Sequence, residues 1–328
     1  MNVNAPPPAR RFRPVLLVNT ALAGTLLAFS VSGDASPLAL SGGDAGASAQ
    51  DVAEAGAARE DSLVEDSLDQ RPPAGEARLP LSDPRSDARL ANAMAPLAVE
   101  PSARLSVSVL ALESGASATF GAERFDTASI VKVEILAALL LRAQDEGREL
   151  TDLEQERADV MIRASDNAAT DALWWLIGGA SGLAEANERL GLTSTIPGHD
   201  GHWGLTQTTS ADQIALLRAV YTADSPLTPT SRDYLQELMA TVVDGQRWGV
   251  SAAADETFEL KNGWLPRTET GLWDVNSIGR VRAGGQEYLI AVVSDGHPTQ
   301  EAGIAAVEWA ARTAVAALDP AEPLAPTT

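Results

Sequence analysis

The 328-residue sequence contains no cysteine, and this absence removes several kinds of chemistry at once. Disulfides, thiolate metal sites, cysteine nucleophiles and lipid attachment through a cysteine all require a sulfur atom that the sequence lacks. Imidazole is also scarce, with only three histidines. We therefore expect no metal and no cofactor, and a nucleophile must come from serine, threonine, lysine or a carboxylate.

Lysine is nearly absent as well. Of the 24 lysine and arginine residues, only Lys132 and Lys261 are lysines. Codon bias in a high-GC genome explains the arginines, but it does not explain where the two lysines stand. Arginine stays protonated at any useful pH, whereas a buried lysine can release its proton and act as a base. The two lysines are therefore candidates for catalytic groups.

Positive charge is in deficit, and the formal net charge is -21. This balance argues against binding nucleic acid, whose phosphates demand a basic face, and against anionic membrane surfaces. Hydrophobic residues make up 45% of the chain, which is enough to bury a core. We therefore expect a folded monomer with a small-molecule partner.

Residues 1–35 resemble a secretory signal. Arg10, Arg11 and Arg13 precede an apolar stretch that opens into small and polar residues before Ser36. Cleavage near Ser36 predicts a secreted or extracytoplasmic protein at the cell-envelope face, with no stable membrane insertion afterwards. An uncleaved membrane anchor is the alternative, although the apolar run is rather short for a span.

The rest of the chain divides into three parts. Residues 36–81 are rich in Ala, Gly, Asp, Glu, Ser and Pro and predict a disordered acidic spacer. One domain is expected over residues 82–320, and residues 321–328 are expected to form a flexible tail. Strands are expected at 105–110, in a second segment that ends near residue 120, and at 257–261, 274–282 and 287–294. Helices are expected at 85–97, in a segment that begins near residue 127, and at 151–162, 168–177, 181–190, 210–221, 229–242 and 299–318. This order suggests a sheet assembled from both ends, with a helical lobe inserted in the middle.

One predicted helix carries a pair of reactive side chains. Asp126 or Thr127 is expected to cap it, and apolar residues cover most of its circumference, which predicts a buried central helix. Ser129 and Lys132 lie one turn apart on the same face, where they can touch. A desolvated lysine is able to remove the serine proton, and the helix N-terminus adds positive potential where an oxyanion forms. Alone, this spacing also occurs by chance on many helices.

Two further short motifs follow along the chain. Ser165-Asp166-Asn167 stands at the junction of two predicted helices, where serine or aspartate also serves as an ordinary helix cap. Lys261-Asn262-Gly263 stands at the end of a predicted strand, where an exposed lysine before a glycine turn is the ordinary interpretation. Each motif is weak by itself. The three together, in this order and containing both lysines, require three coincidences if they carry no chemistry.

The combination resembles the three-part signature of class A β-lactamases and penicillin-binding proteins. The similarity also includes Leu112–Gly115, Glu123–Phe125 and Thr208–Ala211, and it covers roughly Ser82 to Leu318. It implies a mixed α/β fold of the α+β type, a three-layer sandwich in which helices flank a five-stranded antiparallel sheet, with an inserted all-helical lobe beside the site. It also implies an active-site-serine hydrolase whose partner is a β-lactam or a peptidoglycan-type peptide.

The resemblance assigns catalytic roles to four residues. Ser129 resembles the acylated nucleophile, and Lys132 resembles the neighbouring base or proton relay. Ser165 looks like the hydroxyl that passes a proton to the leaving nitrogen. Lys261 is expected to bind the substrate carboxylate and to lower the pKa of its neighbours.

Three substrate-binding residues follow from the same resemblance. Asn167 looks like the amide that holds the acyl side chain of the substrate. Gly263 leaves the strand edge open, so that the backbone N–H groups of Ser129 and Trp264 can form an oxyanion hole.

The deacylating segment departs from the family pattern. Class A enzymes place a glutamate there in an E-x-x-L-N sequence, whereas the matching segment between Leu190 and Thr208 contains no glutamate. Asp200, His199 and His202 are the candidates to activate water instead.

The third motif departs too, because Asn262 replaces a threonine or serine whose hydroxyl normally helps to hold the substrate carboxylate. The arginine expected nearby for the same purpose is not apparent. Arg267 and Arg280 are the candidates for it. Carboxylate recognition is therefore in doubt.

Three functions remain open at this point. The leading one is a β-lactamase-like hydrolase that forms a Ser129 acyl-enzyme with β-lactams or related amides. The missing glutamate favours a penicillin-binding D-alanyl-D-alanine peptidase with slow deacylation, whereas the single-domain size and the class A resemblance favour the β-lactamase. A catalytically inactive binding module of the same fold is disfavoured, because binding alone does not require both lysines and both serines.

Overall fold

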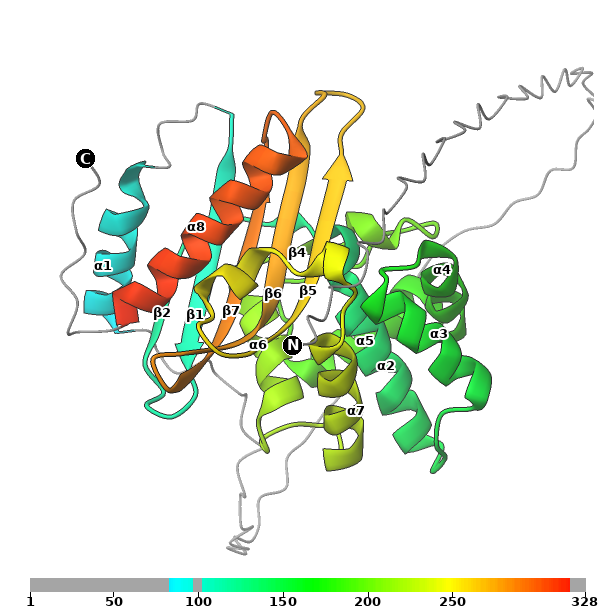
Figure 1. The fold of residues 1–328 in the computed structure, drawn as a ribbon. Helices are drawn as coiled ribbons and strands as arrows, with labels where there is room; N and C mark the ends of the chain where they lie inside the picture. Colours follow the sequence, from blue (N-terminus) through cyan, green and yellow to red (C-terminus); the bar gives the residue numbers. More distant parts are fainter. Residues whose placement is uncertain (1–82, 97–101, 319–328) are drawn as a thin grey trace, which may run out of the picture. The chain divides into compact units, whose positions relative to one another are not determined.

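The computed structural model describes residues 83–96 and 102–318 (Figure 1). The predicted signal peptide, spacer and C-terminal tail lie outside the described residues. Besides the strands and longer helices given below, the short elements are β3 (Phe125–Asp126), β4 (Gln207–Thr208), η2 (Ala128–Ile130), η3 (Trp203–Leu205), η4 (Asp244–Gln246) and η5 (Gly249–Ala253). Of the helices in the described ranges, none has the length and apolar character that a bilayer crossing needs.

The central sheet has five antiparallel strands in the order β2-β1-β7-β6-β5. Its members are β1 (Arg104–Ala111), β2 (Ser117–Phe120), β5 (Phe258–Pro266), β6 (Trp273–Ala283) and β7 (Gln286–Asp295). Along β1, residues 104–111 pair with residues 295–288 of β7, so the two ends of the domain meet in one sheet. This confirms the predicted fold class and leaves β5 as an edge strand.

Helices cover both faces of the sheet (Figure 1). On one face α1 (Pro84–Met94) and α8 (Gln300–Leu318) enclose one buried apolar cluster. On the other face α6 (Ser210–Tyr221) packs against β1 and β7 as part of a second cluster. Because alternate side chains of a strand point to opposite faces, both sides of the sheet are apolar and both are buried.

The second apolar cluster continues into a helical lobe. The lobe consists of α2 (Val131–Asp145), α3 (Asp152–Arg163), α4 (Asn167–Leu176), α5 (Gly179–Leu190) and α7 (Pro229–Ala240). Almost all of α2 is buried, as its apolar circumference predicts. In α3, Thr151 and Glu154 form a reciprocal capping box, which fixes where that helix begins after α2.

Two sequence-based predictions near the site were wrong. Strand β5 does not end at Lys261, because residues 262–266 continue the ladder against residues 277–273 of β6. The helix after β3 has no side-chain cap from Thr127, and Asp126 is bound to Gln207 and Arg267 instead. A short 3-10 turn therefore precedes α2.

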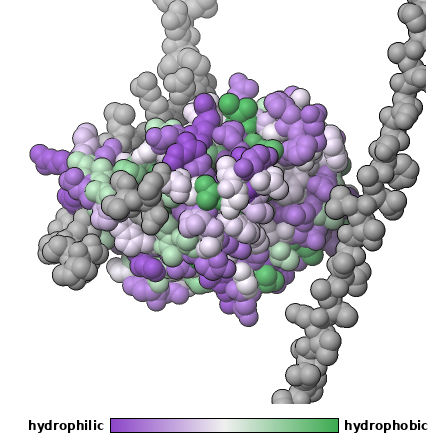
Figure 2. Space-filling model, turned by 90° about the horizontal axis from the view of Figure 1, so that it is seen from above, coloured by the Kyte–Doolittle hydropathy of each residue, from purple (hydrophilic) through white to green (hydrophobic). Residues whose placement is uncertain are grey.

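The surface seen from above, over the turn between β5 and β6, is mainly hydrophilic, with small separate hydrophobic patches (Figure 2). Among the described residues, the large hydrophobic side chains that are exposed are Leu153, Val160, Trp175, Ile196, Leu205 and Val243.

Candidate active site

Ser129 lies in a strained turn at the head of the buried helix α2. The preceding residue, Ala128, has a φ of 46°, in the left-handed region. This conformation costs an L-residue about 1–2 kcal/mol, so neighbouring contacts must hold it. Asn276 of β6 supplies two of them, because its amide donates to the backbone oxygens of Asp126 at 2.8 Å and Thr127 at 3.0 Å. Ser129 itself is half-buried and so remains partly open to solvent.

Lys132 stands one turn after Ser129, and its side chain is fully buried. Its Nζ donates to the backbone oxygen of Ser165 at 2.7 Å, to Ser165 Oγ at 3.1 Å and to Asn167 Oδ1 at 2.8 Å. These three bonds use all the protons of a charged ammonium group. A neutral lysine keeps only two protons, so its lone pair is then free to accept one from a neighbouring hydroxyl.

Burial lowers the pKa of Lys132 to about 7, while the carboxylates of Asp166 and Asp171 act in the opposite direction. The effect of burial is the larger one, because the charged amine loses more stabilisation by water than the two exposed carboxylates give back. Near neutral pH, the amine is therefore present in both protonation states. A group poised in this way is suited to accept and return a proton.

Lys261 reaches the same point from the sheet. Its Nζ donates to Ser165 Oγ at 3.0 Å and to the backbone oxygen of Asn262 at 2.8 Å, and only 1% of the residue is exposed. Burial, and secondly the charge of Lys132, hold the pKa of Lys261 well below its usual value. The two lysines of the chain thus meet at a single serine hydroxyl.

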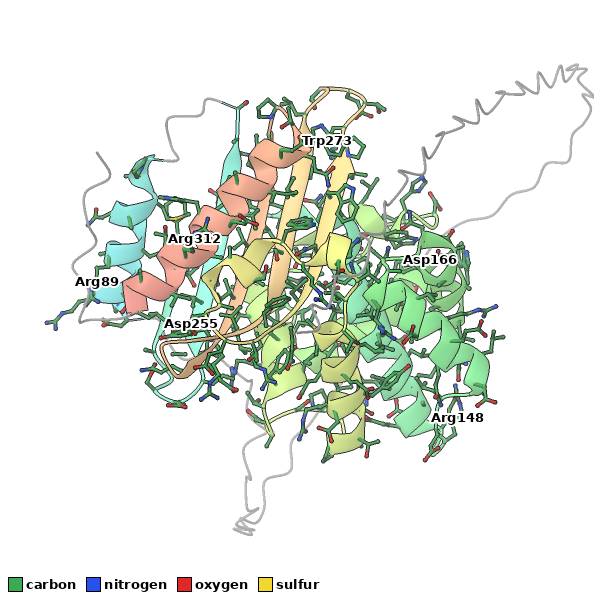
Figure 3. All side chains as sticks on the ribbon, in the orientation of Figure 1. Arg89, Arg148, Asp166, Asp255, Trp273 and Arg312 are labelled. Atoms are coloured by element: carbon green, nitrogen blue, oxygen red, sulfur yellow. The ribbon has the colours of Figure 1, made fainter. Side chains whose placement is uncertain are left out.

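Ser165 occupies another left-handed position, with a φ of 60°, between α3 and α4. Its Oγ accepts from both amines, which occupies its two lone pairs and leaves its own proton for a third partner. Asp166, the next residue, caps α4 by accepting from the backbone N–H of Ala169 at 2.7 Å. The helix-cap interpretation of this motif therefore holds for Asp166. Figure 3 shows Asp166 at the start of α4.

Gly263 lets β5 approach the serine turn. A Cβ atom at this position would lie 2.7 Å from both the backbone nitrogen of Ser129 and the backbone oxygen of Thr127. Approaches under 3.0 Å to backbone atoms are not tolerated, so any side chain here would push the strand away. The absence of a side chain is what places the strand edge beside the N–H group of Ser129.

Trp264 points its ring away from Ser129. The ring packs on Trp248 with centroids 5.9 Å apart and contributes to the apolar cluster on the α8 face. Any contact with a ligand at Ser129 must therefore come from the backbone of Trp264, as the resemblance implies.

Asn262 also lies on the far side of β5, as strand alternation requires when Lys261 and Gly263 face the site. It is fully buried, and its Nδ2 donates to the backbone oxygens of Gln246 at 2.7 Å and Trp248 at 3.0 Å. The amide therefore holds the segment of η4 and η5 against the back of the strand.

The two candidate carboxylate-binding arginines are already paired. Arg267, just past β5, contacts Asp126 Oδ2 at 2.5 Å and Asp274 Oδ2 at 3.4 Å. Arg280 contacts Glu259 at 2.5 Å, towards the opposite end of the same strand pair. Burial raises the pKa of Asp274 to about 7, and Arg267 opposes that rise.

The loop between α5 and α6 brings an aromatic side chain to the amine of Lys132. The ring centroid of Trp203 lies 4.9 Å from Lys132 Nζ, and its indole N–H donates to Asp171 Oδ1 at 2.8 Å. The three residues predicted to activate water, Asp200, His199 and His202, are exposed, and no hydrogen bond joins any of them to Lys132.

Sequence reasoning missed Trp203, although a signal was present. It is the one large aromatic residue in a segment of small and polar residues, and glycine follows it at Gly204. A side chain at Gly204 would come within 3.8 Å of the Ala128 Cα atom, which shows how closely this segment lies against the serine turn.

A buried acid, Glu134, stands two residues after Lys132 and was also missed. It accepts from Gln213 Nε2 at 2.8 Å and Asn187 Nδ2 at 3.2 Å, and burial raises its pKa to about 7. These bonds link α2 to α6 and α5. Glu134 therefore anchors the lobe and has no contact with Ser165.

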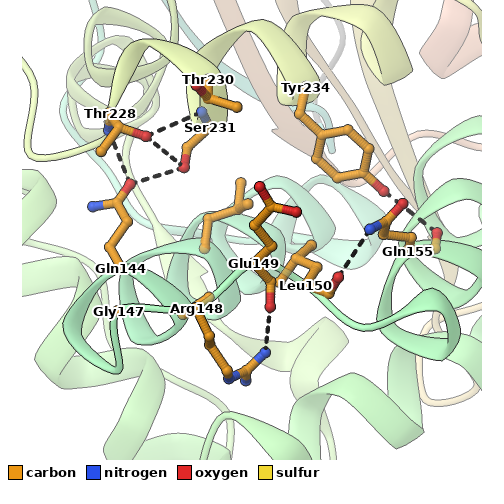
Figure 4. Close-up of a pocket in the computed structure, with 12 residues that line it drawn as sticks. Gln144, Gly147, Arg148, Glu149, Leu150, Gln155, Thr228, Thr230, Ser231 and Tyr234 are labelled. Atoms are coloured by element: carbon orange, nitrogen blue, oxygen red, sulfur yellow. Dashed lines mark hydrogen bonds between the residues drawn. The ribbon is translucent and has the colours of Figure 1, made fainter.

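A cavity of about 510 Å³ lies at the opposite end of α2 (Figure 4). Its walls come from the end of α2, the start of α3 and the start of α7. Gln144 in the wall accepts from Thr228 N at 2.9 Å and Ser231 Oγ at 2.8 Å. Gln144 lies twelve residues after Lys132, roughly 18 Å along a helix, so this cavity is separate from the serine-lysine site.

Several solved structures share this fold. The chain is similar to PBP-A, with 24% identity, a TM-score of 0.62 and coverage of 72% of this chain and 97% of that chain. A PBP-A variant described as an acyl-enzyme complex with penicillin G matches at a TM-score of 0.59, 24% identity and coverage of 69% and 94%. A class A β-lactamase representative from Bacteroides cellulosilyticus matches at a TM-score of 0.62, with 20% identity and coverage of 72% and 99%. At these identities, the likeness shows the fold alone.

Among curated proteins, the chain is similar to "Putative lipoprotein LppW" of Mycobacterium tuberculosis and of Mycobacterium bovis. Identity is 32% over 173 residues, which cover 50% of this chain and 54% of the relative. The chain thus spans about half the length of the curated relatives it matches.

The family comparison covers the part of the chain that holds Ser165, Asn167, Lys261 and Gly263. A family model described as "Beta-lactamase enzyme family" matches residues 155–318. This range is half of the 328-residue chain. The range runs from within α3 to the end of α8 and includes strands β5, β6 and β7, so it contains Ser165 and Lys261, whereas Ser129 and Lys132 precede it. The chain therefore belongs to this β-lactamase enzyme family, Beta-lactamase2.

Proposed function

We propose that the protein is an active-site-serine hydrolase that forms an acyl-enzyme at Ser129 with β-lactams or related amides. One observation carries the proposal: Ser165 Oγ lies 3.1 Å from Lys132 Nζ and 3.0 Å from Lys261 Nζ, and Lys132 stands one helical turn after the partly open Ser129. Two buried amines sharing one hydroxyl make a route for a proton. A fold needs no such arrangement for its stability, because burying two amines is unfavourable.

Acylation follows from this geometry. Neutral Lys132 takes the proton of Ser129, whose oxygen then bonds to the substrate carbonyl carbon. The backbone N–H groups of Ser129 and Trp264 stabilise the oxyanion, and Gly263 keeps the strand close enough for them to act together. As the carbon–nitrogen bond breaks, Ser165 gives its proton to the leaving nitrogen. Lys132 returns the proton to Ser165, so that no net proton is lost.

Release of the acyl group is expected to be slow. Hydrolysis of the ester needs a group that positions and deprotonates water, which typically contributes about 100-fold to 10,000-fold in rate. Here the loop presents the ring of Trp203 to Lys132, whereas Asp200, His199 and His202 are exposed and form no hydrogen bond to Lys132. This observation favours the second candidate function, a penicillin-binding D-alanyl-D-alanine peptidase with slow β-lactam turnover, over an efficient β-lactamase.

A binding module without catalysis is the weaker alternative. Ser129 follows Ala128, which has a left-handed backbone conformation, and Ser165 has such a conformation itself. Each left-handed residue costs about 1–2 kcal/mol. Strain of this kind gathers at sites whose geometry is used. A binding role would leave both strained turns without a purpose.

We also propose that the protein acts outside the cytoplasm. The signal-like residues 1–35 support this proposal, and so does the relatives' name, which describes lipoproteins. Lipid attachment through a cysteine cannot occur within this 328-residue sequence, because it has no cysteine. N-terminal sequencing of exported protein is expected to begin near Ser36, and recovery of Met1 would contradict cleavage.

The function is tested by time-resolved intact-mass spectrometry with benzylpenicillin. We expect a stoichiometric adduct on the wild type that persists after removal of free penicillin, and none on Ser129→Ala. Peptide mapping should place the adduct on Ser129. Rapid hydrolysis with no adduct at any time would contradict slow release, and the absence of both adduct and hydrolysis would contradict the function.

A further inference from the structure

The cavity of about 510 Å³ at the far end of α2 has the size of a small-molecule site, since such sites commonly measure about 300–1,000 Å³. Part of its wall is apolar and comes from Leu140, Ala143 and Leu150. None of the residues assigned to the serine-lysine site lines it. The proposed hydrolysis therefore gives this cavity no role.

One carboxylate in the cavity wall, that of Glu149, has no partner among the described residues. Arg148 donates to the backbone oxygen of Glu149 at 3.0 Å, and no hydrogen bond or ion pair reaches the carboxylate itself. In Figure 4 this side chain points across the cavity towards α7, which contributes Ser231 and Tyr234. The carboxylate is thus free to pair with a ligand.

The positive charge in the wall is already neutralised. Arg148 donates to Glu154 through Nη1 at 2.8 Å and Nη2 at 3.0 Å, and to Glu146 through Nε at 2.5 Å. Arg157 and Arg232 belong to α3 and α7, but neither lines the cavity. An anionic ligand therefore finds no free cation among the lining residues.

Two helix N-termini border the cavity, and both are capped from within the chain. At α3, the capping box of Thr151 and Glu154 occupies N–H groups of the first turn. At α7, Thr228 Oγ1 accepts from Ser231 N at 3.2 Å, and Gln144 Oε1 accepts from Thr228 N at 2.9 Å. These caps take up N–H groups that would otherwise attract an anion.

Tyr234 adds an aromatic ring to the wall, and its hydroxyl contacts the backbone oxygen of Gln155 at 3.4 Å. Burial, and after it the charges of Asp159 and Glu237, raise the pKa of Tyr234 to about 12. The phenol is therefore neutral at physiological pH and lies in a negative potential. The face of such a ring attracts cations.

From these observations we propose that the cavity binds an alkylammonium group, which is a primary amine, charged at neutral pH, on a chain of several methylene groups. Glu149 pairs with the ammonium and Tyr234 contacts it, while the apolar part of the wall covers the methylene groups. A free diamine and a lysine side chain on a peptide offer this same chemistry. The site is separate from Ser129, so the inference does not rest on the proposed function.

The test compares Nα-acetyl-lysine methylamide with Nα-acetyl-norleucine methylamide, which has the same carbon chain without the amine. Binding to the ¹⁵N-labelled full chain is followed by chemical-shift titration in about 0.15 M salt, which screens the general attraction of an acidic chain for cations. We expect a dissociation constant on the order of 1 mM for the lysine compound. The norleucine compound should bind about tenfold more weakly. Equal binding of the two would overturn the proposal.

A third compound, 1,5-diaminopentane, distinguishes the two sources of the ammonium group. Binding at least as tight as that of the lysine compound assigns the cavity to free diamines. Weaker binding assigns it to a side chain carried on a peptide. Both outcomes support an alkylammonium site.

A variant pair tests the carboxylate. Glu149→Gln keeps the shape of the side chain and removes its charge, so the lysine compound should bind about threefold to fivefold more weakly. Glu156→Gln makes the same change at an exposed residue of α3 that does not line the cavity, and binding should be unchanged. Equal dissociation constants in the two variants would contradict the pairing with Glu149.

A cavity-filling variant tests the location. Thr230 is exposed at the start of α7 and lines the cavity, so Thr230→Trp is expected to block the space without disturbing the core. Binding of the lysine compound should fall at least tenfold, and circular dichroism checks that the variant is folded. Wild-type affinity in folded Thr230→Trp would place the ammonium outside the cavity and overturn the proposal.

Discussion

The two sides of the site are held by different kinds of structure. On the sheet side, Lys261 and Gly263 belong to a strand whose backbone is bonded to β6 from residue 258 to residue 266. On the loop side, Trp203 lies in a segment that reaches Lys132 through one ring contact and one side-chain hydrogen bond to Asp171. In the proposed function, Lys261 and the edge of β5 on the sheet side contribute to forming the acyl-enzyme, whereas the loop side is where a water-activating group would stand. We therefore expect changes on the two sides to affect acyl formation and acyl release separately.

The largest expected effect is the loss of acylation rate when Lys132, the proposed base, is replaced. Lys132→Arg keeps the positive charge but removes a group able to lose its proton near pH 7. We expect acylation of Ser129 to slow by about 100-fold to 10,000-fold. Intact mass against time measures the rate, and Arg312→Lys, on the outer helix α8, serves as the control of comparable size. An unchanged rate in Lys132→Arg would show that another group is the base.

On the sheet side, a single added methyl group is expected to displace β5 from the serine turn. Gly263→Ala places a Cβ atom 2.7 Å from backbone atoms of Ser129 and Thr127, so the strand must move. A displacement of about 1 Å in an active site is able to reduce the rate by about 100-fold. We expect a loss of that size in the acylation rate.

Gly245→Ala is the matched control for this change, because a Cβ atom there meets nothing within 4 Å. Circular dichroism and thermal melting of both variants separate a displaced strand from a failure to fold. Full activity in a folded Gly263→Ala variant would contradict the proposed contact between β5 and the serine turn.

On the loop side, a carboxylate introduced at Trp203 tests whether this position controls release of the acyl group. Trp203→Glu introduces a carboxylate near Lys132, where the ring now lies 4.9 Å from Nζ. We expect the acyl-enzyme to lose its adduct about tenfold faster, which is less than a well-placed base achieves. Trp175→Glu makes the same change at a residue that is 65% exposed on α4 and should leave the lifetime unchanged. Equal lifetimes in the two variants would show that the position of Trp203 does not govern release.

The smallest expected effect is a shift in pH dependence. In the proposed mechanism, acylation requires neutral Lys132, so its rate should rise with pH through the pKa of that lysine, about 7. The carboxylate of Asp171 raises this pKa, and removing its charge in Asp171→Asn should therefore move the midpoint to lower pH. The asparagine oxygen is still able to accept from Trp203, which limits the change to charge. A midpoint that stays fixed or moves to higher pH would contradict the assignment of Lys132 as the titrating group.

The sequence determined the fold class and most of the element order. The alternation of Leu105 to Leu110 and the apolar circumference of α2 are local patterns, and burial on both sides of the sheet follows from them. The sequence also selected the two lysines, because their scarcity among arginines draws attention to both positions. The choice of Ser165 as a proton donor came from resemblance, since a capping role was equally compatible with the local sequence.

Only the tertiary structure decided how these residues meet. The extension of β5 through Gly263 depends on its pairing with β6, a contact between residues more than ten positions apart that no local pattern encodes. The place of Trp203 over Lys132 and the capture of Arg267 by Asp126 and Asp274 are also contacts across distant segments. Local propensity reports what a segment prefers alone, whereas the pKa of a lysine and the availability of an arginine depend on which groups the fold brings beside them.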